Sequence, residues 1–364
     1  MSLKLFVAED ESNLIRQYEK SVEKWNNDGK EAIEILTARD KGQAMEILES
    51  KDCDAAILDL MFPGDTPSHA TGNVLLGIIK KQLRYPVYVV TGNPNELDGE
   101  FDDHPFIEVI VRGSIKNDDL LEKIFTRYST GITKIMGKTG RLEKALKEVF
   151  WDHLSHAIPH WEKIDLSPDM KEKQLLRHAL SHLQEVLAID EAGQDEKYNT
   201  AEVYIKPPVR KSVTPGLVVE REGEKFVVIT PACDVSQNKA DFFQLLKLLE
   251  FEKLPDIQSK KRSNNRQNEL KKYIKNKKER FHFLPRYDDL PASLIDFQDV
   301  TTIKSSELPQ NCKHVCTITS PFFKDIVNRY SAYYARQGSP DFTDTDTLSK
   351  QLNEQLPEPE IVQR

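Results

Sequence analysis

The sequence has few of the features that mark secreted, membrane-spanning or general nucleic-acid-binding proteins. Four cysteines in 364 residues are too few for a disulfide scaffold in a chain of this length. No apolar run approaches the roughly 20 residues that cross a bilayer, and a formal net charge of −8 disfavours general binding to nucleic acid. The opening residues, MSLKLFVAEDE, predict a β-strand and not a signal peptide. We therefore expect a cytoplasmic protein.

The composition is otherwise that of a folded protein, with 30% charged and 38% hydrophobic residues. The length allows two or three domains. The residue patterns divide the chain into an α/β domain (1–130), a helical linker or hairpin (131–190), a β-rich domain (200–340) and a polar tail (341–364).

Residues 1–130 alternate short β-branched runs with amphipathic helical stretches. This alternation predicts an α/β fold, with a doubly wound, five-stranded parallel sheet covered by helices on both faces. In such a sheet the ligand site lies beyond the carboxyl ends of the strands, where the strand order reverses. The expected strands are residues 4–8, 34–37, 55–58, 87–90 and 107–111.

Acids and a hydroxyl stand directly after three of these strands. Glu9 and Asp10 follow the first strand, Asp59 the third, and Thr91 the fourth. Three carboxylates at one sheet edge repel one another, and Mg²⁺, which prefers carboxylate, water and phosphate oxygens, removes that repulsion. With Mg²⁺ neutralising an incoming phosphoryl group, a carboxylate can act as the nucleophile. The hydroxyl of Thr91 can donate a hydrogen bond to a phosphoryl oxygen.

These residues, together with Pro63 four positions beyond Asp59 and Gly92 directly after Thr91, resemble the receiver domain of response regulators. The resemblance covers residues 1–130 and implies a flavodoxin-like fold. It also implies a protein of a two-component system, in which Asp59 accepts a phosphoryl group from a histidine kinase or a phosphotransfer protein.

The same resemblance implies a particular magnesium site. Asp10, Asp59 and the backbone carbonyl of Met61 would hold the ion, with Glu9 in support. No chemistry other than phosphorylation and dephosphorylation of the receiver itself is expected, so we do not expect a conventional enzyme.

The sequence departs from the receiver pattern in two places. The family has a phosphoryl-contacting lysine directly after the fifth strand, where this chain has Arg112 or Gly113, and the nearest lysine is Lys116. Arg112 and Lys116 are therefore both candidates, although arginine and lysine are not interchangeable. The family's switch aromatic also has no counterpart in residues 109–111. This favours a receiver that relays or buffers phosphate, or that signals through another surface.

Residues 137–187 change to a helical pattern, with apolar positions on one face of each of two expected helices. We expect a coupling hairpin through which two copies of the chain could form a homodimer. His178 and His182 are one helical turn apart, a spacing that can chelate a metal. A phosphotransfer histidine is a second hypothesis, and surface imidazoles without such a role are the simplest. The GKTG sequence at 137–140 lacks the preceding strand and glycine of a phosphate loop, so we reject a nucleotide site there.

Residues 200–340 predict a small β-barrel or a β-rich α+β domain, with a helix at 322–336 near its end. The segment KFVVITPACDVSQNK, together with RFHFLP, LIDFQDV and SPFFKDIVNRYSAYYARQG, resembles a poorly characterised bacterial family of small β-barrel domains. That resemblance implies a fold and no established chemistry. The expected strands are residues 203–206, 217–220, 225–230, 280–284, 294–301 and 315–319.

Two alternative functions for this part stay open. Cys233, which precedes Asp234 on a turn, could be a nucleophile activated by His282, although a cysteine after a strand is more often simply buried. Residues 260–280 contain ten Lys/Arg and two Glu. A solvated basic insertion is the plain interpretation, and a salt-dependent contact with an acidic partner or with nucleic-acid phosphates is the alternative.

The leading hypothesis is a signalling protein that takes a phosphoryl group at Asp59 and relays or buffers it. No helix-turn-helix signature follows the receiver-like region, which disfavours a conventional transcription factor. Receivers with unusual C-terminal parts also occur in bacterial antiviral two-component systems, and we place this chain there by analogy. The alternative is a phosphorylation-regulated effector with an enzymatic or nucleic-acid-binding C-terminal domain.

Overall fold

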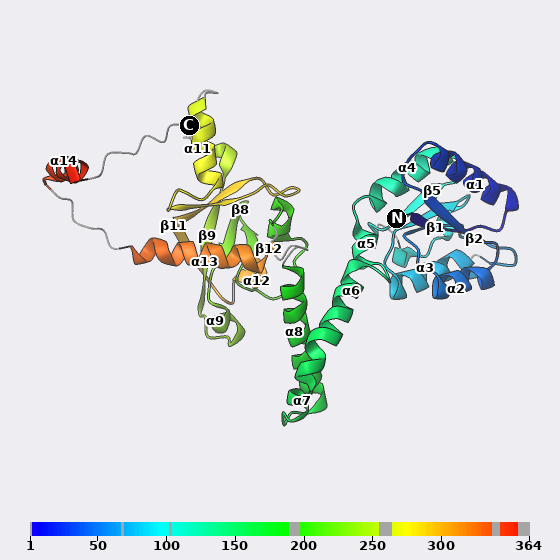
Figure 1. Ribbon diagram of the computed structural model, residues 1–364, viewed down its shortest axis with the longest axis horizontal. Helices are drawn as coiled ribbons and strands as arrows, with labels where there is room; N and C mark the ends of the chain where they lie inside the picture. Colours follow the sequence, from blue (N-terminus) through cyan, green and yellow to red (C-terminus); the bar gives the residue numbers. More distant parts are fainter. Residues whose placement is uncertain are drawn as a thin grey trace. The chain divides into compact units, whose positions relative to one another are not determined.

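The computed structural model divides into two compact units, Met1–Glu196 and Lys197–Arg364, shown in Figure 1. It describes residues 2–66, 69–101, 104–188, 197–254, 264–336 and 343–355. Within these ranges no helix is long and apolar enough to cross a membrane. The end of the predicted helical linker or hairpin at 131–190 and the basic segment at 260–280 lie partly outside the described residues.

A five-stranded, all-parallel sheet forms the centre of the first unit, in the order β2-β1-β3-β4-β5. This is the flavodoxin-like doubly wound order, which reverses direction between β1 and β3. The predicted parallel sheet is confirmed. Its strands are β1 (Leu3–Ala8), β2 (Ile33–Ala38), β3 (Ala55–Leu58), β4 (Val87–Thr91) and β5 (Ile107–Val111).

Four helices cover the two faces of this sheet. α1 (Ser12–Asn27) and α4 (Asn117–Tyr128) pack on one face, where Trp25 and Ile124 join the strand residues in a common core. α2 (Lys41–Ser50) and α3 (Thr71–Gln82) pack on the other. Because the central strands are buried on both faces, they read as nearly continuous apolar runs.

The connection from β4 to β5 is different, because its described residues contain no α-helix. It holds only the short 3₁₀ turns η2 (Pro94–Glu96) and η3 (Gly99–Phe101), and its sequence is rich in Gly, Pro and Asp, which break helices. Val109 and Val111 of β5 are consequently 37% and 51% exposed. Helices therefore cover both faces of the sheet as predicted, while this edge strand stays partly exposed.

The first unit continues into a helical hairpin after α4. Its own apolar core is small, with Ala145, Val149 and Leu183 as the buried residues. Pro159 lies inside the chain-reversing end of the hairpin. The elements are α5 (Ile132–Met136), α6 (Arg141–Glu148), the π-helix η4 (Val149–Leu154), α7 (Ser155–Glu162) and α8 (Pro168–Leu187).

The second unit contains a seven-stranded sheet in the order β10-β11-β9-β8-β7-β12-β6, antiparallel at every pairing. β9 was not predicted, because FFQLLKLLE lacks the alternation of a half-buried strand and is apolar on both faces. The strands are β6 (Tyr204–Ile205), β7 (Leu217–Arg221), β8 (Glu224–Val228), β9 (Phe242–Glu250), β10 (Phe281–Leu284), β11 (Ser293–Lys304) and β12 (Lys313–Ile318).

This sheet curls into an open half-barrel, which is broadly consistent with the predicted β-rich domain. Among the described residues its two edge strands, β6 and β10, share no backbone pairing. Side chains link the two edges instead: the Tyr204 hydroxyl donates a 2.9 Å hydrogen bond to the carbonyl of Pro285, and Lys206 forms an ion pair of 2.7 Å with Asp288. The β-rich α+β description is the one that fits.

Helices fill the edges and one face of the half-barrel. α13 (Ser320–Ala335) packs on one face through Ile326 and its neighbouring aromatic side chains. The other face has a separate core that includes Val219, Phe243 and Leu308. The region predicted as a polar tail contains the exposed helix α14 (Thr345–Gln355). The remaining elements are η5 (Thr200–Val203), α9 (Ala232–Ser236), η6 (Phe251–Lys253), α11 (Asn264–Ile274) and α12 (Leu308–Asn311).

Candidate functional site

Three carboxylates gather where the strand order reverses. Glu9 and Asp10 follow β1, and Asp59 follows the neighbouring strand β3, in register with it. One oxygen of each side chain lies within 4.8 Å of an oxygen of the other two. Glu9 and Asp59 are buried, at 3% and 7% exposure. The sequence-based prediction that Glu9, Asp10 and Asp59 meet is therefore confirmed by the geometry.

The backbone around Asp59 is held by a close approach of α3. The N–H of Gly72, at the start of α3, donates a 2.9 Å hydrogen bond to the carbonyl of Leu60. A Cβ at position 72 would lie 2.5 Å from the carbonyl oxygen of Asp59, so only glycine allows this contact. Asp65 ties the loop to the same helix by accepting hydrogen bonds from the N–H groups of Phe62 (2.9 Å) and Thr71 (2.6 Å).

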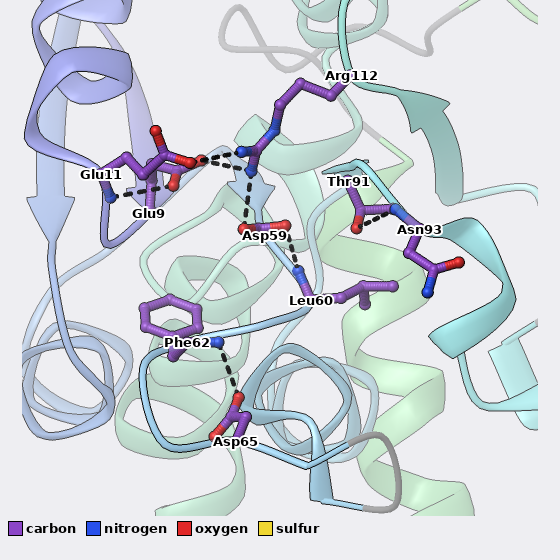
Figure 2. A network of polar contacts seen from close by, with 9 residues as sticks. All are labelled: Glu9, Glu11, Asp59, Leu60, Phe62, Asp65, Thr91, Asn93 and Arg112. Carbon is purple, nitrogen blue, oxygen red and sulfur yellow. Dashed lines mark hydrogen bonds and ion pairs between the residues drawn. The ribbon is translucent and has the colours of Figure 1, made fainter.

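Arg112, which follows β5, places its guanidinium among the acids, as Figure 2 shows. One terminal nitrogen donates to Oδ2 of Asp59 at 2.8 Å and to Oε2 of Glu9 at 3.1 Å. The other donates to Oε1 of Glu11 at 3.0 Å. The second oxygen of Asp59, Oδ1, accepts the N–H of Leu60 at 2.8 Å. Both oxygens of the candidate nucleophile are thus engaged by donors.

The site disfavours the negative charges of its carboxylates, even though the guanidinium of Arg112 lies among them. Burial raises the pKa of Glu9 to about 7, and the neighbouring Asp59 adds to the rise against the opposing Glu11 N–H and Arg112. Burial also raises the pKa of Asp59, although Arg112 and the Leu60 N–H oppose it. Burial alone would lower the pKa of Arg112, but Asp59 and Glu9 outweigh it and the pKa is raised. One guanidinium does not compensate the clustered carboxylates.

The donor set suits Mg²⁺ in its chemistry. Carboxylate oxygens are the ligands that this hard cation takes, together with waters and phosphate oxygens. The uncompensated acids, of which Glu9 shows the largest pKa shift, are what a bound divalent cation would stabilise. Met61, whose backbone carbonyl is the third predicted magnesium ligand, lies two residues beyond Asp59 in the loop that follows β3.

Thr91 is the last residue of β4, the strand beside β3, and is 2% exposed. Its Oγ1 accepts the backbone N–H of Asn93 at 3.2 Å, which leaves the hydroxyl hydrogen available for donation. Figure 2 shows Thr91 on the side of Asp59 that faces Leu60 and Asn93. The sequence-predicted hydroxyl therefore lies at the acidic edge.

A groove of about 570 Å³ lies between α1 and the β5–α4 loop, next to Arg112. Arg112 and Lys116 both line it, but they occupy different positions. Arg112 contacts Asp59, whereas Lys116 is exposed at the N-cap of α4. Of the two candidates for the missing lysine, the structure places Arg112 at the site.

Comparison with known proteins found likenesses between the N-terminal third of the chain and solved receiver domains. The receiver domain of Francisella response regulator 1452 is 20% identical with a TM-score of 0.29, and the match covers 35% of this chain and 98% of that one. Response regulator TrrA of Thermotoga maritima, in complex with Mg²⁺ and BeF, is 25% identical with a TM-score of 0.26, covering 34% and 97%. The receiver domain of RcsB from Salmonella enterica serovar Typhimurium is 23% identical with a TM-score of 0.28, covering 36% and 91%.

No family model and no curated protein matches the chain. These likenesses are weak.

Glu11 was not among the residues predicted for the site. Glu11 is the third acid that Arg112 contacts, and the acidic run Glu9–Asp10–Glu11 was a signal that could have pointed to it. Only the path of the chain after β1, which turns into α1, shows that Glu11 also faces the guanidinium.

The structure does not join the proposed nucleophile pair of the second unit. Cys233 is exposed on α9, and its Sγ lies 3.5 Å from the carboxylate of the adjacent Asp234, whereas a reactive thiolate needs a positive setting. His282 is buried on β10, where burial and Arg329 lower its pKa to about 3. No described hydrogen bond connects Cys233 to His282.

The described part of the basic segment forms α11 and the loop after it. Tyr273, its one aromatic residue, contacts Phe251 edge-on and Phe281 at a tilted angle, and Lys278 lies over its ring, so the ring is engaged within the protein. Lys272 pairs with Glu269 at 2.6 Å, and Arg280 pairs with Asp296. These pairs neutralise part of the basic charge and favour the interpretation as a solvated surface.

Proposed function

We propose that this protein is a two-component signalling protein whose first unit is a Mg²⁺-dependent phosphoryl acceptor, with Asp59 as the phosphorylated residue. The single observation that carries the proposal is the gathering of Glu9, Asp10 and Asp59 within 4.8 Å at the topological switch point. A bound Mg²⁺ would supply charge neutralisation for the acids and for phosphoryl oxygens.

Asp59, Thr91 and Arg112 carry out the other steps of the transfer. Oδ2 of Asp59 leaves its hydrogen bond to Arg112 and attacks the phosphorus of a phosphohistidine. A P–O bond forms, the P–N bond breaks, and the imidazole leaves with the electron pair and takes up a proton. Thr91 donates its hydroxyl hydrogen to a phosphoryl oxygen, and Arg112 turns from the carboxylate to the phosphoryl group, which its planar donor fork suits.

The partners follow from this chemistry. The donor is a histidine kinase or a phosphotransfer protein, which would present its phosphohistidine at the edge of the sheet where Asp59 lies. The chain relays or buffers the phosphoryl group, because the β5 residues 109–111 lack an aromatic switch residue. We also propose that the protein acts in the cytoplasm, within an antiviral two-component system. The antiviral role predicts that the wild type protects cells against phage and that Asp59→Asn does not.

Phosphorylation of the full chain by a small acyl-phosphate donor tests the proposal. We expect a Mg²⁺-dependent shift in a phosphate-affinity gel that disappears with hydroxylamine, which cleaves acyl phosphates, and that is absent in Asp59→Asn. Glu46→Gln is the matched control: it neutralises an exposed acid on α2 that makes no described contact with the acidic cluster, and it should keep the shift. An unshifted wild type, or an Asp59→Asn protein that shifts normally, would refute the assignment.

We further propose that the helical hairpin forms a homodimer. Its buried core is small, while Phe150 and Trp151 on η4 and Leu176 and Leu180 on α8 are at least half exposed, at 56%, 69%, 61% and 50%. Apolar side chains on both helices of a hairpin are what a four-helix bundle of two copies would bury. The second copy is the partner that this face fits, because both of its helices then gain the core that one hairpin lacks.

A phosphorylation-regulated effector is the second candidate. Lys271, Lys275 and Lys277 are exposed and have no ion pair among the described residues. These free charges favour an effector that makes a salt-dependent contact with nucleic-acid phosphates over an effector that uses Cys233 as a nucleophile. A gel shift in low salt, abolished by charge reversal of these lysines, would support it, and the absence of any shift would remove it.

A further inference from the structure

The histidines of the helical hairpin have no part in the phosphoryl-acceptor proposal, and two of them are in contact. His178 and His182 lie one turn apart on α8, and their Nε2 atoms are 3.2 Å apart. Two imidazole nitrogens bound to one tetrahedral ion at ~2.0–2.1 Å are separated by roughly 3.3 Å. The two rings therefore already stand at the separation of a chelating pair.

The contact is informative because of what imidazoles can do. Two Nε2 atoms at this distance form a hydrogen bond only if one carries a hydrogen and the other does not. A metal ion between them instead accepts both lone pairs, with each ring keeping its hydrogen on Nδ1. Both rings are half-buried, so they are held in place yet open to an ion from solvent.

A third imidazole comes from the other helix of the hairpin. The ring of His153 stacks on that of His182, with centroids 5.8 Å apart. His153 lies on η4, a π-helix, and such segments are rare and often found at functional sites. It is exposed, and because the three histidines do not form a ready-made group of ligands among the described residues, His153 must rotate its side chain to supply a third nitrogen to an ion held by the α8 pair.

We propose that His178 and His182, with His153 as the third ligand, bind an imidazole-preferring divalent transition-metal ion such as Zn²⁺, Ni²⁺ or Cu²⁺. The ion joins η4 to α8 and holds together a hairpin whose apolar core is small. This site lies on the helical hairpin, with ligands of a different kind from those of the acidic cluster at β1 and β3, and it does not depend on phosphorylation of Asp59.

Titration of the full chain with Ni²⁺ tests the proposal, in excess Mg²⁺ so that the carboxylate site does not compete. The ring of Trp161 is 5.6 Å from that of His178, so a paramagnetic ion there quenches its fluorescence, and calorimetry gives the stoichiometry. We expect one ion per chain, with binding and quenching lost in His178→Ala and His182→Ala and weakened in His153→Ala.

The hairpin supplies matched controls. His156 and His160 are exposed on α7 and make no described contact with the pair, so His156→Ala and His160→Ala should bind Ni²⁺ as the wild type does. Unchanged helical circular dichroism shows that the α8 variants fold, and Asp59→Asn should bind Ni²⁺ normally. The proposal is overturned if the wild type does not bind Ni²⁺, if His178→Ala and His182→Ala bind it equally well, or if the controls lose it too.

Discussion

Arg112 donates a 2.8 Å hydrogen bond to Oδ2 of Asp59, so the candidate nucleophile is held in an ion pair with a residue 53 positions away in the chain. Because Oδ1 accepts the N–H of Leu60, Oδ2 must leave the guanidinium before it can bind phosphorus. The same guanidinium contacts Glu9 and Glu11. Arg112 thus links the state of Asp59 to those of Glu9 and Glu11.

Removal of the guanidinium should change magnesium affinity and stability in opposite directions. Arg112→Ala leaves Asp59 and Glu9 without their counter-charge, so we expect tighter Mg²⁺ binding by calorimetry. Without divalent ions the free energy of unfolding should fall by about 1–3 kcal/mol at pH 8, less than for a fully buried pair because the arginine side chain is partly exposed.

Arg84→Ala is the comparison for this experiment. It breaks an exposed ion pair with Glu143 and should cost less than about 1 kcal/mol without changing Mg²⁺ affinity. Equal Mg²⁺ affinities of wild type and Arg112→Ala would show that the guanidinium and the ion do not compete for the same carboxylates.

Glu9 should make the metal-free protein less stable as the pH rises. Its pKa is about 7 in the folded chain against 4.5 for an ordinary glutamate carboxyl, so between these values the folded state holds a proton that the unfolded state has lost. The resulting stabilisation is complete below pH 4.5, declines as the pH rises, and is lost above pH 7. Glu9→Gln, which cannot ionise, should therefore be more stable than wild type at pH 8, by about 1–3 kcal/mol.

Urea unfolding with a chelator present, followed by the fluorescence of the buried Trp25, measures this difference. At pH 5 the two proteins should be nearly equal in stability. A Glu9→Gln protein that is no more stable than wild type at pH 8 would contradict the shifted pKa.

Gly72 should tolerate no side chain, because a Cβ there meets the backbone of Asp59 and Leu60 at 2.5 and 2.6 Å. We expect Gly72→Ala to lower the free energy of unfolding by about 1–3 kcal/mol and to slow phosphorylation by displacing Asp59. Gly77→Ala on the same helix has nothing within 4 Å and should stabilise by about 0.5–1 kcal/mol. Similar stabilities of the two variants would argue against the close approach.

The oligomeric state tests the exposed apolar face of the hairpin. Light scattering after size-exclusion chromatography should give a dimer for the wild type and a monomer for Leu176→Lys with Leu180→Lys, because charges cannot be buried there without cost. Val74→Lys, at an equally apolar but isolated exposed position on α3, should leave the dimer intact. A monomeric wild type at micromolar concentrations would refute the dimer.

The acidic site was largely readable from the sequence. Glu9, Asp10, Asp59 and Thr91 each follow an apolar run, and parallel strands bring their carboxyl ends to one edge, so local pattern and topology were sufficient. The β-rich character of residues 200–340 was also apparent. Strand β9 was not, since FFQLLKLLE is apolar on both faces and has no period to read.

Other features were decided only by the tertiary structure. The sequence offered Arg112 and Lys116 equally, and the path of the chain after β5 placed the first against Asp59. Only the tertiary structure shows that the valines of β5 are uncovered and that the edges of the half-barrel meet through Tyr204. It alone also places His153 beside His182. Periodicity reports which elements form and which face is apolar, whereas contacts between distant residues depend on loop paths and packing that no local pattern encodes.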